Sequence, residues 1–275
     1  MVFVVDGKKL AAEREEALKA LSGVEGFKAK LVSIVLADDA SGQLYTRLKK
    51  EAAGRIGVHF VVENVDKFSV DILLPIIEKY SKDGETHGII IQRPGGLWRQ
   101  LKGLDRSQFE SDWSRLVAAI AQQKDVDGLR PDSKFTMATV KAVEAILESV
   151  KAKGKVVIVG SAGLVGRILV KKLKATGVDL ETKDLAAVTS QADILISATG
   201  QAGLVKADMV KKGAIVIDVG WPKADVDFEA VVKKASVITP VPGGVGPLTV
   251  ICLLENLAEA CYSNAYHSHS GSSLD

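Results

Sequence analysis

Short, almost uniformly apolar segments alternating with helical stretches constrain the fold of this chain more than any other feature. A segment that is apolar on both faces is typical of a strand in a parallel sheet covered on both sides by helices. Strands that alternate with helices are joined by right-handed crossovers in one sheet. The candidate strands are 29–37, 58–65, 88–92, 155–159, 178–182, 193–199, 214–219 and 236–239. The pattern predicts two α/β domains with parallel sheets, separated near residues 124–154.

The stretch 237–251, VITPVPGGVGPLTVI, joins the last of these strands to an apolar helix. Its glycines, Gly243, Gly244 and Gly246, allow backbone atoms to approach a ligand closely. Pro247 suits the first turn of the helix, where a missing N–H costs least, and helix N-termini attract negative charge. A plain strand-to-helix turn would have the same composition, so this stretch is a candidate ligand loop with a structural alternative.

A second glycine turn lies in KVVIVGSAGLVG, residues 155–166, with the strand, turn and helix order of a dinucleotide-binding fold. Its residues are Gly160, Ser161, Ala162, Gly163, Val165 and Gly166. The spacing is GxxGxxG rather than GxGxxG, which is a weak fingerprint by itself, but its position predicts pyrophosphate binding at the helix N-terminus. The next predicted strand, 178–182, holds Glu181, which suits a ribose 2′-hydroxyl, and Lys183 just after it suits a 2′-phosphate, so the residues leave NAD and NADP both open.

Five polar residues of the first half of the chain are candidates for chemistry. Tyr45 and Lys49 share one face of a predicted helix, where a ring could hold a flat ligand beside an acid or base. An ordinary exposed pair has the same spacing. Gln92 ends a buried strand, where open α/β sheets place ligands, although it could simply terminate that strand. Asp125 and Asp127 in KDVDG could bind a polar heterocycle, but an Asp–Gly turn explains them equally well.

Composition argues against several classes of function. Lys and Arg total 36 against 34 Asp and Glu, a net charge of +2, which gives no electrostatic case for nucleic acid or an anionic membrane as partner. Cys252 and Cys261 lie nine residues apart on one predicted helix, too far to bridge, which favours a reducing, cytoplasmic compartment. The four histidines lack a second donor at ligand spacing, so no metal site is predicted.

Several motifs together resemble the family of bifunctional methylenetetrahydrofolate dehydrogenase/methenyltetrahydrofolate cyclohydrolases. They are ITPVPGGVGPLT (238–249), KDVDG (124–128), YTRLK (45–49), IQRP (91–94) and ADILISATGQAG…GAIVIDVG (192–220). The resemblance implies NAD(P)-dependent oxidation of 5,10-methylenetetrahydrofolate and hydrolysis of the 5,10-methenyl product to 10-formyltetrahydrofolate. It also implies tetrahydrofolate derivatives as ligands, NADP as cofactor with NAD possible, no metal, and a cytoplasmic homodimer.

The same resemblance implies two domains. A folate-binding catalytic domain would span residues 1–136 and be completed by a C-terminal helix at 247–275. A Rossmann-type NAD(P)-binding domain would span 137–246. Two long helices, near 137–150 and 247–262, would bridge the domains, and the cleft between them would hold both ligands.

Each candidate residue then receives an implied role. Lys49 would be the catalytic base or acid, tuned by a hydrogen bond with Gln92. Tyr45 would stack on the pterin or aminobenzoyl ring, and Asp127 would bind the pterin edge with Asp125 beside it. The folate would also contact Gly243, Gly244 and Pro247. The cofactor would contact the turn residues Gly160, Ser161, Ala162, Gly163, Val165 and Gly166, and also Thr139, Lys183, Thr199, Gly200, Gly220, Gly244 and Thr249.

The chain departs from the family pattern at several places, among them Gly42, where the family usually has a serine three residues before the tyrosine. The usual Gly-Arg-Ser after the first cofactor-domain strand is Gly160-Ser161-Ala162, so the arginine expected to meet a 2′-phosphate is missing. The usual Gln-Leu-Pro-Leu-Pro is QRPGG at 92–96, and the Pro-x-Thr-Pro before the linking helix keeps only Thr139. Two alternatives follow: a monofunctional or NAD-preferring dehydrogenase of the same family, or a diverged nucleotide-binding protein without catalysis.

Overall fold

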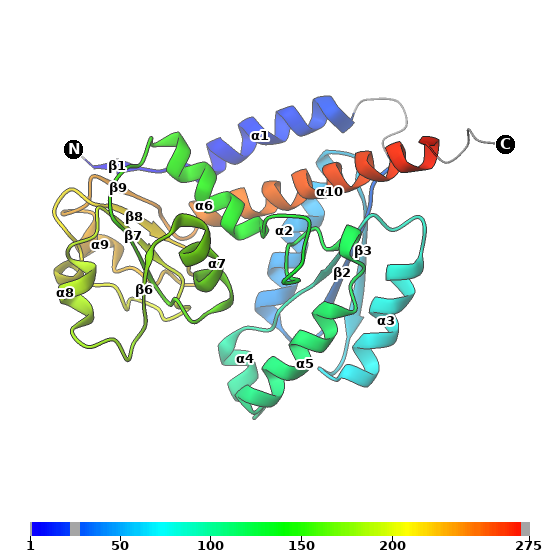
Figure 1. The fold of residues 1–275 in the computed structure, drawn as a ribbon, viewed down its shortest axis with the longest axis horizontal. Coiled ribbons are helices and arrows are strands. Elements are labelled where there is room, and N and C mark those ends of the chain that lie inside the picture. Colours follow the sequence, from blue (N-terminus) through cyan, green and yellow to red (C-terminus); the bar gives the residue numbers. More distant parts are fainter. Residues whose placement is uncertain (1, 23–27, 271–275) are drawn as a thin grey trace. The chain divides into compact units, whose positions relative to one another are not determined.

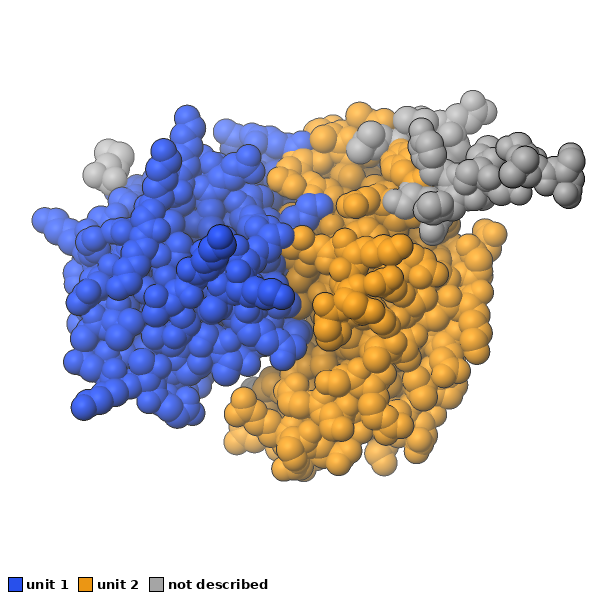
Figure 2. Space-filling model, viewed as in Figure 1, with its two compact units in different colours: residues 1–13, 139–249 blue, residues 14–138, 250–275 orange. Residues whose placement is uncertain are grey.

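The computed structural model describes residues 2–22 and 28–270, and Figure 1 shows the path of the chain. The chain forms two compact units, which Figure 2 distinguishes by colour. Unit 1 comprises Met1–Glu13 and Thr139–Thr249, and unit 2 comprises Arg14–Ala138 and Val250–Asp275. The boundaries between units fall inside helix α1, at the start of helix α6 and inside helix α10.

Strands and helices alternate along almost the whole described chain. In chain order, the elements are β1 (Phe3–Val4), α1 (Gly7–Ser22), β2 (Lys30–Leu36), α2 (Ala40–Arg55), β3 (His59–Val65), α3 (Val70–Lys82), β4 (Gly88–Ile91), α4 (Gly96–Leu101), α5 (Arg106–Ala118), the 3-10 helix η1 (Gln122–Lys124), α6 (Ala138–Ser149), β5 (Val156–Val159), α7 (Leu164–Leu173), β6 (Thr176–Val178), α8 (Leu185–Thr189), β7 (Ile194–Ser197), the 3-10 helix η2 (Ala207–Met209), β8 (Ile215–Asp218), α9 (Phe228–Val231), β9 (Val237–Ile238) and α10 (Val245–Ser270).

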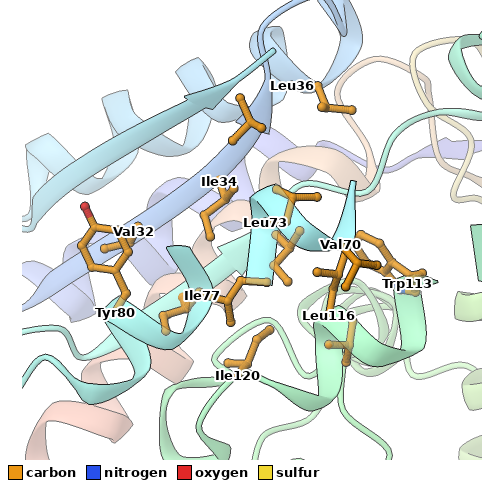
Figure 3. Packing of buried hydrophobic residues seen from close by; sticks show 14 of the residues in the cluster. Val32, Ile34, Leu36, Val70, Leu73, Ile77, Tyr80, Trp113, Leu116 and Ile120 are labelled. Atoms are coloured by element: carbon orange, nitrogen blue, oxygen red, sulfur yellow. The ribbon is translucent and has the colours of Figure 1, made fainter. Parts of the chain in front are cut away.

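Unit 2 is built on a three-stranded sheet in the order β3-β2-β4, with every pair parallel. The helix α2 packs on β2 and β3, while α3 packs on β4 and α5. Figure 3 shows apolar side chains of β2, α3 and α5 meeting in one cluster, in which Ile34, Ile77, Leu116 and Ile120 are at most 1 % exposed. Both faces of the central strand are therefore buried, as its uniformly apolar sequence predicts.

Unit 1 contains a six-stranded sheet in the order β1-β9-β8-β7-β5-β6, again parallel throughout. The predicted fold class, two α/β units with parallel sheets, is confirmed. The N-terminal strand adds to the edge of this sheet, with Phe3 in register with Val237. For this reason residues 1–13 belong to unit 1, whereas the sequence places them in the domain 1–136. A two-residue strand carries too little pattern to reveal its distant partner.

Some elements differ from the sequence prediction in ways that affect the candidate site. The strand expected over 178–182 is β6, Thr176–Val178, and it ends where Asp179 and Thr182 form a turn: the N–H of Asp179 donates to Thr182 Oγ1 at 2.9 Å. The sequence pattern did not predict the short helix α4, which begins at Gly96. The early end of β6 arises from the local hydrogen bond to Thr182, which hydrophobic periodicity does not report.

The helix α10 combines length with an apolar sequence. Its segment Val245–Tyr262 is the one described segment long and apolar enough to cross a membrane by these two criteria, and 67 % of it is buried within the protein. A buried core helix meets the same criteria, so this segment gives only weak support for a membrane span.

Candidate active site

The polar candidates of the first half of the chain converge around Lys49 in unit 2. Its side chain, which extends from α2, is only 3 % exposed. Lys49 Nζ donates to Gln92 Oε1 at 3.2 Å and lies 4.0 Å from Asp127 Oδ2. It also lies 4.7 Å from the centre of the Tyr45 ring. The helical i,i+4 pair and the end of β4 thus meet at one point, as parallel α/β topology favours.

Burial controls the charge of this lysine. Desolvation lowers the pKa of Lys49 below its ordinary value, and the negative charge of Asp127 offsets that effect only in part. A lowered pKa increases the fraction of neutral amine near neutral pH, and only the neutral amine can accept a proton. The surroundings of Lys49 therefore suit a general base better than a structural ion pair.

The sheet fixes the position of Gln92. The backbone N–H of Gln92 donates to Ile34 O at 2.8 Å, which extends the β2–β4 ladder by one residue. Its side chain lies close to Gly42 on α2, where an added Cβ would come 3.1 Å from Gln92 Cγ. Asp39, which is 3 % exposed, crowds the same point, since that Cβ would lie 2.6 Å from Asp39 Oδ2. A larger residue at Gly42 would therefore displace groups beside Lys49.

Asp125 and Asp127 have different surroundings despite their spacing. The side chain of Asp125 is fully buried and accepts the N–H groups of Leu129 at 3.0 Å and Arg130 at 2.9 Å. Burial raises the pKa of Asp125, and these two N–H groups oppose that shift. Asp125 thus holds its own loop together, whereas Asp127 is 17 % exposed and directs its carboxylate toward Lys49.

Two further residues hold the Asp127 loop: Gly128, which the predicted Asp–Gly turn contains, and Asn256, which the sequence did not indicate. Asn256 on α10 donates to the carbonyl oxygens of Val126 at 2.8 Å and Thr136 at 2.9 Å. Gly128 adopts φ +69°, and a Cβ there would lie 2.5 Å from the backbone N of Met137. The loop therefore needs glycine at 128 and a buried amide from a helix more than a hundred residues away. Only the latter lacks a local sequence signal.

Unit 1 contains the expected glycine turn after β5. Gly160 adopts φ +87°, and a Cβ there would lie 2.6 Å from Ala198 O. A Cβ on Gly166 would lie 2.0 Å from Gly160 O, so neither position tolerates a side chain. Gly163 is the N-cap of α7, and both it and Ala162 are exposed. An exposed turn at a helix N-terminus, which only glycines can form, fits a dinucleotide pyrophosphate.

Two buried carboxylates, also missed, shape the loops after β7 and β8. Asp225 is fully buried, and its Oδ2 accepts the N–H groups of Thr199 at 2.7 Å and Gly200 at 3.2 Å. Asp218 Oδ1 accepts the N–H of Gly220 at 2.7 Å. Burial raises the pKa of Asp218. The expected cofactor residues Thr199, Gly200 and Gly220 thus lie in loops ordered from within the unit.

The remaining residues expected to contact the cofactor or the folate are placed as follows. Gly243 adopts φ +108°, and a Cβ on Gly244 would lie 2.6 Å from Pro240 O. Thr249 is 4 % exposed, and its hydroxyl donates to Val245 O at 3.1 Å within α10. Lys183 is exposed in the loop after β6, Val165 and Pro247 lie in the first turns of α7 and α10, and Thr139 lies in the first turn of α6.

No group of three His, Cys, Asp or Glu side chains in residues 2–22 and 28–270 is arranged to hold a metal ion.

Comparison with known proteins identifies the family of this chain. Residues 5–127 match the "Tetrahydrofolate dehydrogenase/cyclohydrolase, catalytic domain", and residues 137–265 match the "Tetrahydrofolate dehydrogenase/cyclohydrolase, NAD(P)-binding domain". The chain belongs to the tetrahydrofolate dehydrogenase/cyclohydrolase family. The resemblance seen in the sequence motifs and the expectation of a Rossmann-type second domain are confirmed.

Similar proteins cover nearly the whole chain. The "Bifunctional protein FolD" of an Exiguobacterium species is 39 % identical, with 94 % of this chain and 98 % of the relative covered. The structure of the bifunctional enzyme FolD from Campylobacter jejuni has a TM-score of 0.83 and 33 % identity, with 96 % of this chain and 100 % of that chain covered. The Trypanosoma brucei FolD, solved with NADP and an inhibitor, has a TM-score of 0.81 and 27 % identity, with 96 % of this chain and 98 % of that chain covered.

Proposed function

We propose that this protein oxidises 5,10-methylenetetrahydrofolate to 5,10-methenyltetrahydrofolate with NADP or NAD and hydrolyses that product to 10-formyltetrahydrofolate, in one-carbon metabolism. Family membership supports both activities, and NAD stays the alternative cofactor. The observation that carries the proposal is the buried Lys49 with Gln92, Asp127 and Tyr45 around it. We assign the folate to unit 2, which contains this cluster, and the dinucleotide to unit 1, which contains the glycine turn.

Hydrolysis needs a base beside the bridge carbon of the methenyl cation. The neutral Lys49 amine accepts a proton from water while the water oxygen bonds to that carbon. The hydroxyl now on the carbon then loses its proton to solvent as the formyl C=O forms. The carbon–nitrogen bond to the ring breaks in the same step, and the proton held by Lys49 passes to the departing nitrogen. Gln92 Oε1 accepts a hydrogen bond from Nζ at 3.2 Å and so orients the amine. A positioned base of this kind contributes roughly 10²- to 10⁴-fold to rate.

Oxidation is mainly a matter of position. The dinucleotide, when bound, supplies the nicotinamide ring that accepts a hydride from the methylene carbon. The chain contributes the turn at Gly160–Gly166 for the pyrophosphate and the ordered loops at Thr199 and Gly220 for the rest of the cofactor. Tyr45 would stack on a flat ring of the folate, and Asp127 would accept hydrogen bonds from the pterin edge. Gly243, Gly244 and Pro247 stay proposed folate contacts on the strength of the family resemblance.

We also infer that the protein acts as a homodimer in the cytoplasm. Family resemblance supports the dimer. Cys252 and Cys261 form no disulfide in the described part of the chain, which fits a reducing compartment.

Substitution of Lys49 by methionine tests the proposal. Methionine keeps most of the apolar stem and removes the amine, so we expect cyclohydrolase activity to disappear while folding and dinucleotide binding persist. Lys50→Met is the matched control, because Lys50 is the neighbouring exposed lysine and lies outside the cluster. A Lys49→Met protein that hydrolyses methenyltetrahydrofolate at the normal rate would rule out the assigned role.

Initial rates with NAD and with NADP, at saturating methylenetetrahydrofolate, test the oxidation. Formation of methenyltetrahydrofolate with either dinucleotide supports the dehydrogenase. Dinucleotide binding without binding of any reduced folate would favour a protein without catalysis.

A further inference from the structure

The strand β6 ends in a carboxylate that faces the glycine turn. Asp179 follows Val178 directly, 19 residues after Gly160. In dinucleotide-binding folds, an acid about 20 residues beyond the glycine turn, at the end of the second strand, binds the ribose 2′-hydroxyl of NAD. Sequence periodicity extends this strand to residue 182 and so points to Glu181. The shorter strand moves the position to Asp179.

The turn itself holds the Asp179 carboxylate. Ser161 Oγ donates to Asp179 Oδ2, and the N–H of Ala162 lies 3.1 Å from Oδ2 and 3.2 Å from Oδ1. Gly177 permits this approach, because a Cβ there would lie 2.7 Å from Ser161 Cβ. The backbone of Asp179 is anchored by Thr182 Oγ1 at 2.9 Å. The carboxylate is therefore fixed in place.

These contacts have two consequences for an adenosine ribose. A carboxylate has about four acceptor positions, roughly two on each oxygen. Oδ1 accepts only the Ala162 N–H, so it can still accept a hydrogen bond from a ribose hydroxyl. The Ala162 N–H and the Ser161 hydroxyl, which could otherwise donate to a phosphate, already donate to Asp179. The next residue, Leu180, is apolar and 51 % exposed. Among the described residues, Asp179 forms no salt bridge that would neutralise its charge.

We propose that Asp179 reads the 2′ position of the adenosine ribose: it accepts a hydrogen bond from the 2′-hydroxyl of NAD and repels the 2′-phosphate of NADP. A phosphate monoester carries a charge of about −1.5 to −2 at neutral pH, so it meets a like charge at this point. The inference rests on the proposed function and concerns only which dinucleotide binds more tightly. NADP remains a substrate of lower affinity, and Asp179 is the residue that sets the ratio.

Calorimetric binding of ADP-ribose and 2′-phospho-ADP-ribose tests this without folate or catalysis. We expect the wild-type protein to bind ADP-ribose about tenfold more tightly, the ratio that corresponds to roughly 1.4 kcal/mol. Asp179→Asn keeps the shape and removes the charge, so the ratio should fall about tenfold, whereas Asp179→Glu should keep the preference. Glu181→Gln is the matched control, because it removes an exposed negative charge from the same loop and should leave the ratio unchanged.

Two outcomes overturn the inference. One is that the wild-type protein binds the 2′-phosphorylated ligand more tightly. This measurement does not depend on whether any variant folds. The other is an equal loss of affinity for both ligands in Asp179→Asn, which would mean that the carboxylate only supports the turn. Failure to oxidise methylenetetrahydrofolate would overturn the proposed function and leave this binding ratio intact.

Discussion

Replacement of Gln92 by glutamate tests whether the charge of Lys49 controls hydrolysis. The two side chains are nearly isosteric, so the change places a carboxylate oxygen where Oε1 now lies, 3.2 Å from Lys49 Nζ. A negative charge at this distance favours the ammonium form of the lysine. The pKa of Lys49 is lowered by burial in the native protein, and the substitution would raise it again.

The distance sets the size of the effect. Two unit charges 3.2 Å apart attract by about 1.3 kcal/mol at a dielectric constant of ~80 and by about 5 kcal/mol at an effective value of ~20. A free-energy difference of about 1.36 kcal/mol corresponds to one pKa unit. The pH at which the hydrolysis rate reaches half of its maximum should therefore move upward by at least about one unit. The base is neutral above that midpoint, so activity at neutral pH should fall about tenfold or more.

The assay is the loss of methenyltetrahydrofolate absorbance across a pH series, with the spontaneous rate subtracted at each pH. Gln100→Glu serves as control, because Gln100 is exposed on α4 in the same unit and its substitution by glutamate adds the same negative charge away from Lys49. Its pH profile should match that of the native protein. If Gln92→Glu folds normally and its midpoint does not move, Lys49 is not the group that titrates in hydrolysis.

Three other substitutions have expected outcomes. Gly166→Ala places a methyl group 2.0 Å from Gly160 O, so the turn must shift. Dinucleotide affinity measured by calorimetry should fall at least about tenfold, while the hydrolysis of methenyltetrahydrofolate persists. Unchanged dinucleotide affinity would contradict the tight turn. Leu116→Ala removes a fully buried side chain and should lower the free energy of unfolding in urea by about 2–5 kcal/mol, and a loss under 1 kcal/mol would mean that the core collapses around the gap. The hydrogen bond from Lys30, with that from Thr86, depresses the pKa of Asp83, so its stabilisation is present above its ordinary pKa of 3.8 and is lost as pH falls below it. Asp83→Asn should therefore destabilise the protein at neutral pH, with a difference in melting temperature that shrinks on acidification; a pH-independent difference would contradict this.

Much of the architecture followed from local pattern. Apolar runs such as Gly88–Ile91 are buried on both faces in a covered parallel sheet, and this pattern predicted the two parallel sheets, although not the extent of β6 or the pairing of β1. The glycine pattern at 160 and 166 also predicted a tight turn. In the structure, a Cβ at either position would clash with backbone oxygen, so only glycine fits. Tyr45 and Lys49 share a helix face by spacing alone.

Other features depend on contacts between distant parts of the chain. No local pattern could show that Phe3 pairs with Val237, or that Asn256 holds the loop of Asp127. Asp225 is ordinary in sequence and becomes important because folding buries its carboxylate against the N–H groups of Thr199 and Gly200.

The sequence by itself therefore determined the fold class, the family and the types of residue available for chemistry, because periodicity, glycine placement and motif order are local properties. Only the tertiary structure decided the environment of each polar group. It buried Lys49 beside Gln92, which lowers the pKa of its amine, and it ended β6 early so that Asp179 meets Ser161. Desolvation and the exact end of a strand depend on neighbours that are distant in the chain, and those neighbours are specified only by folding.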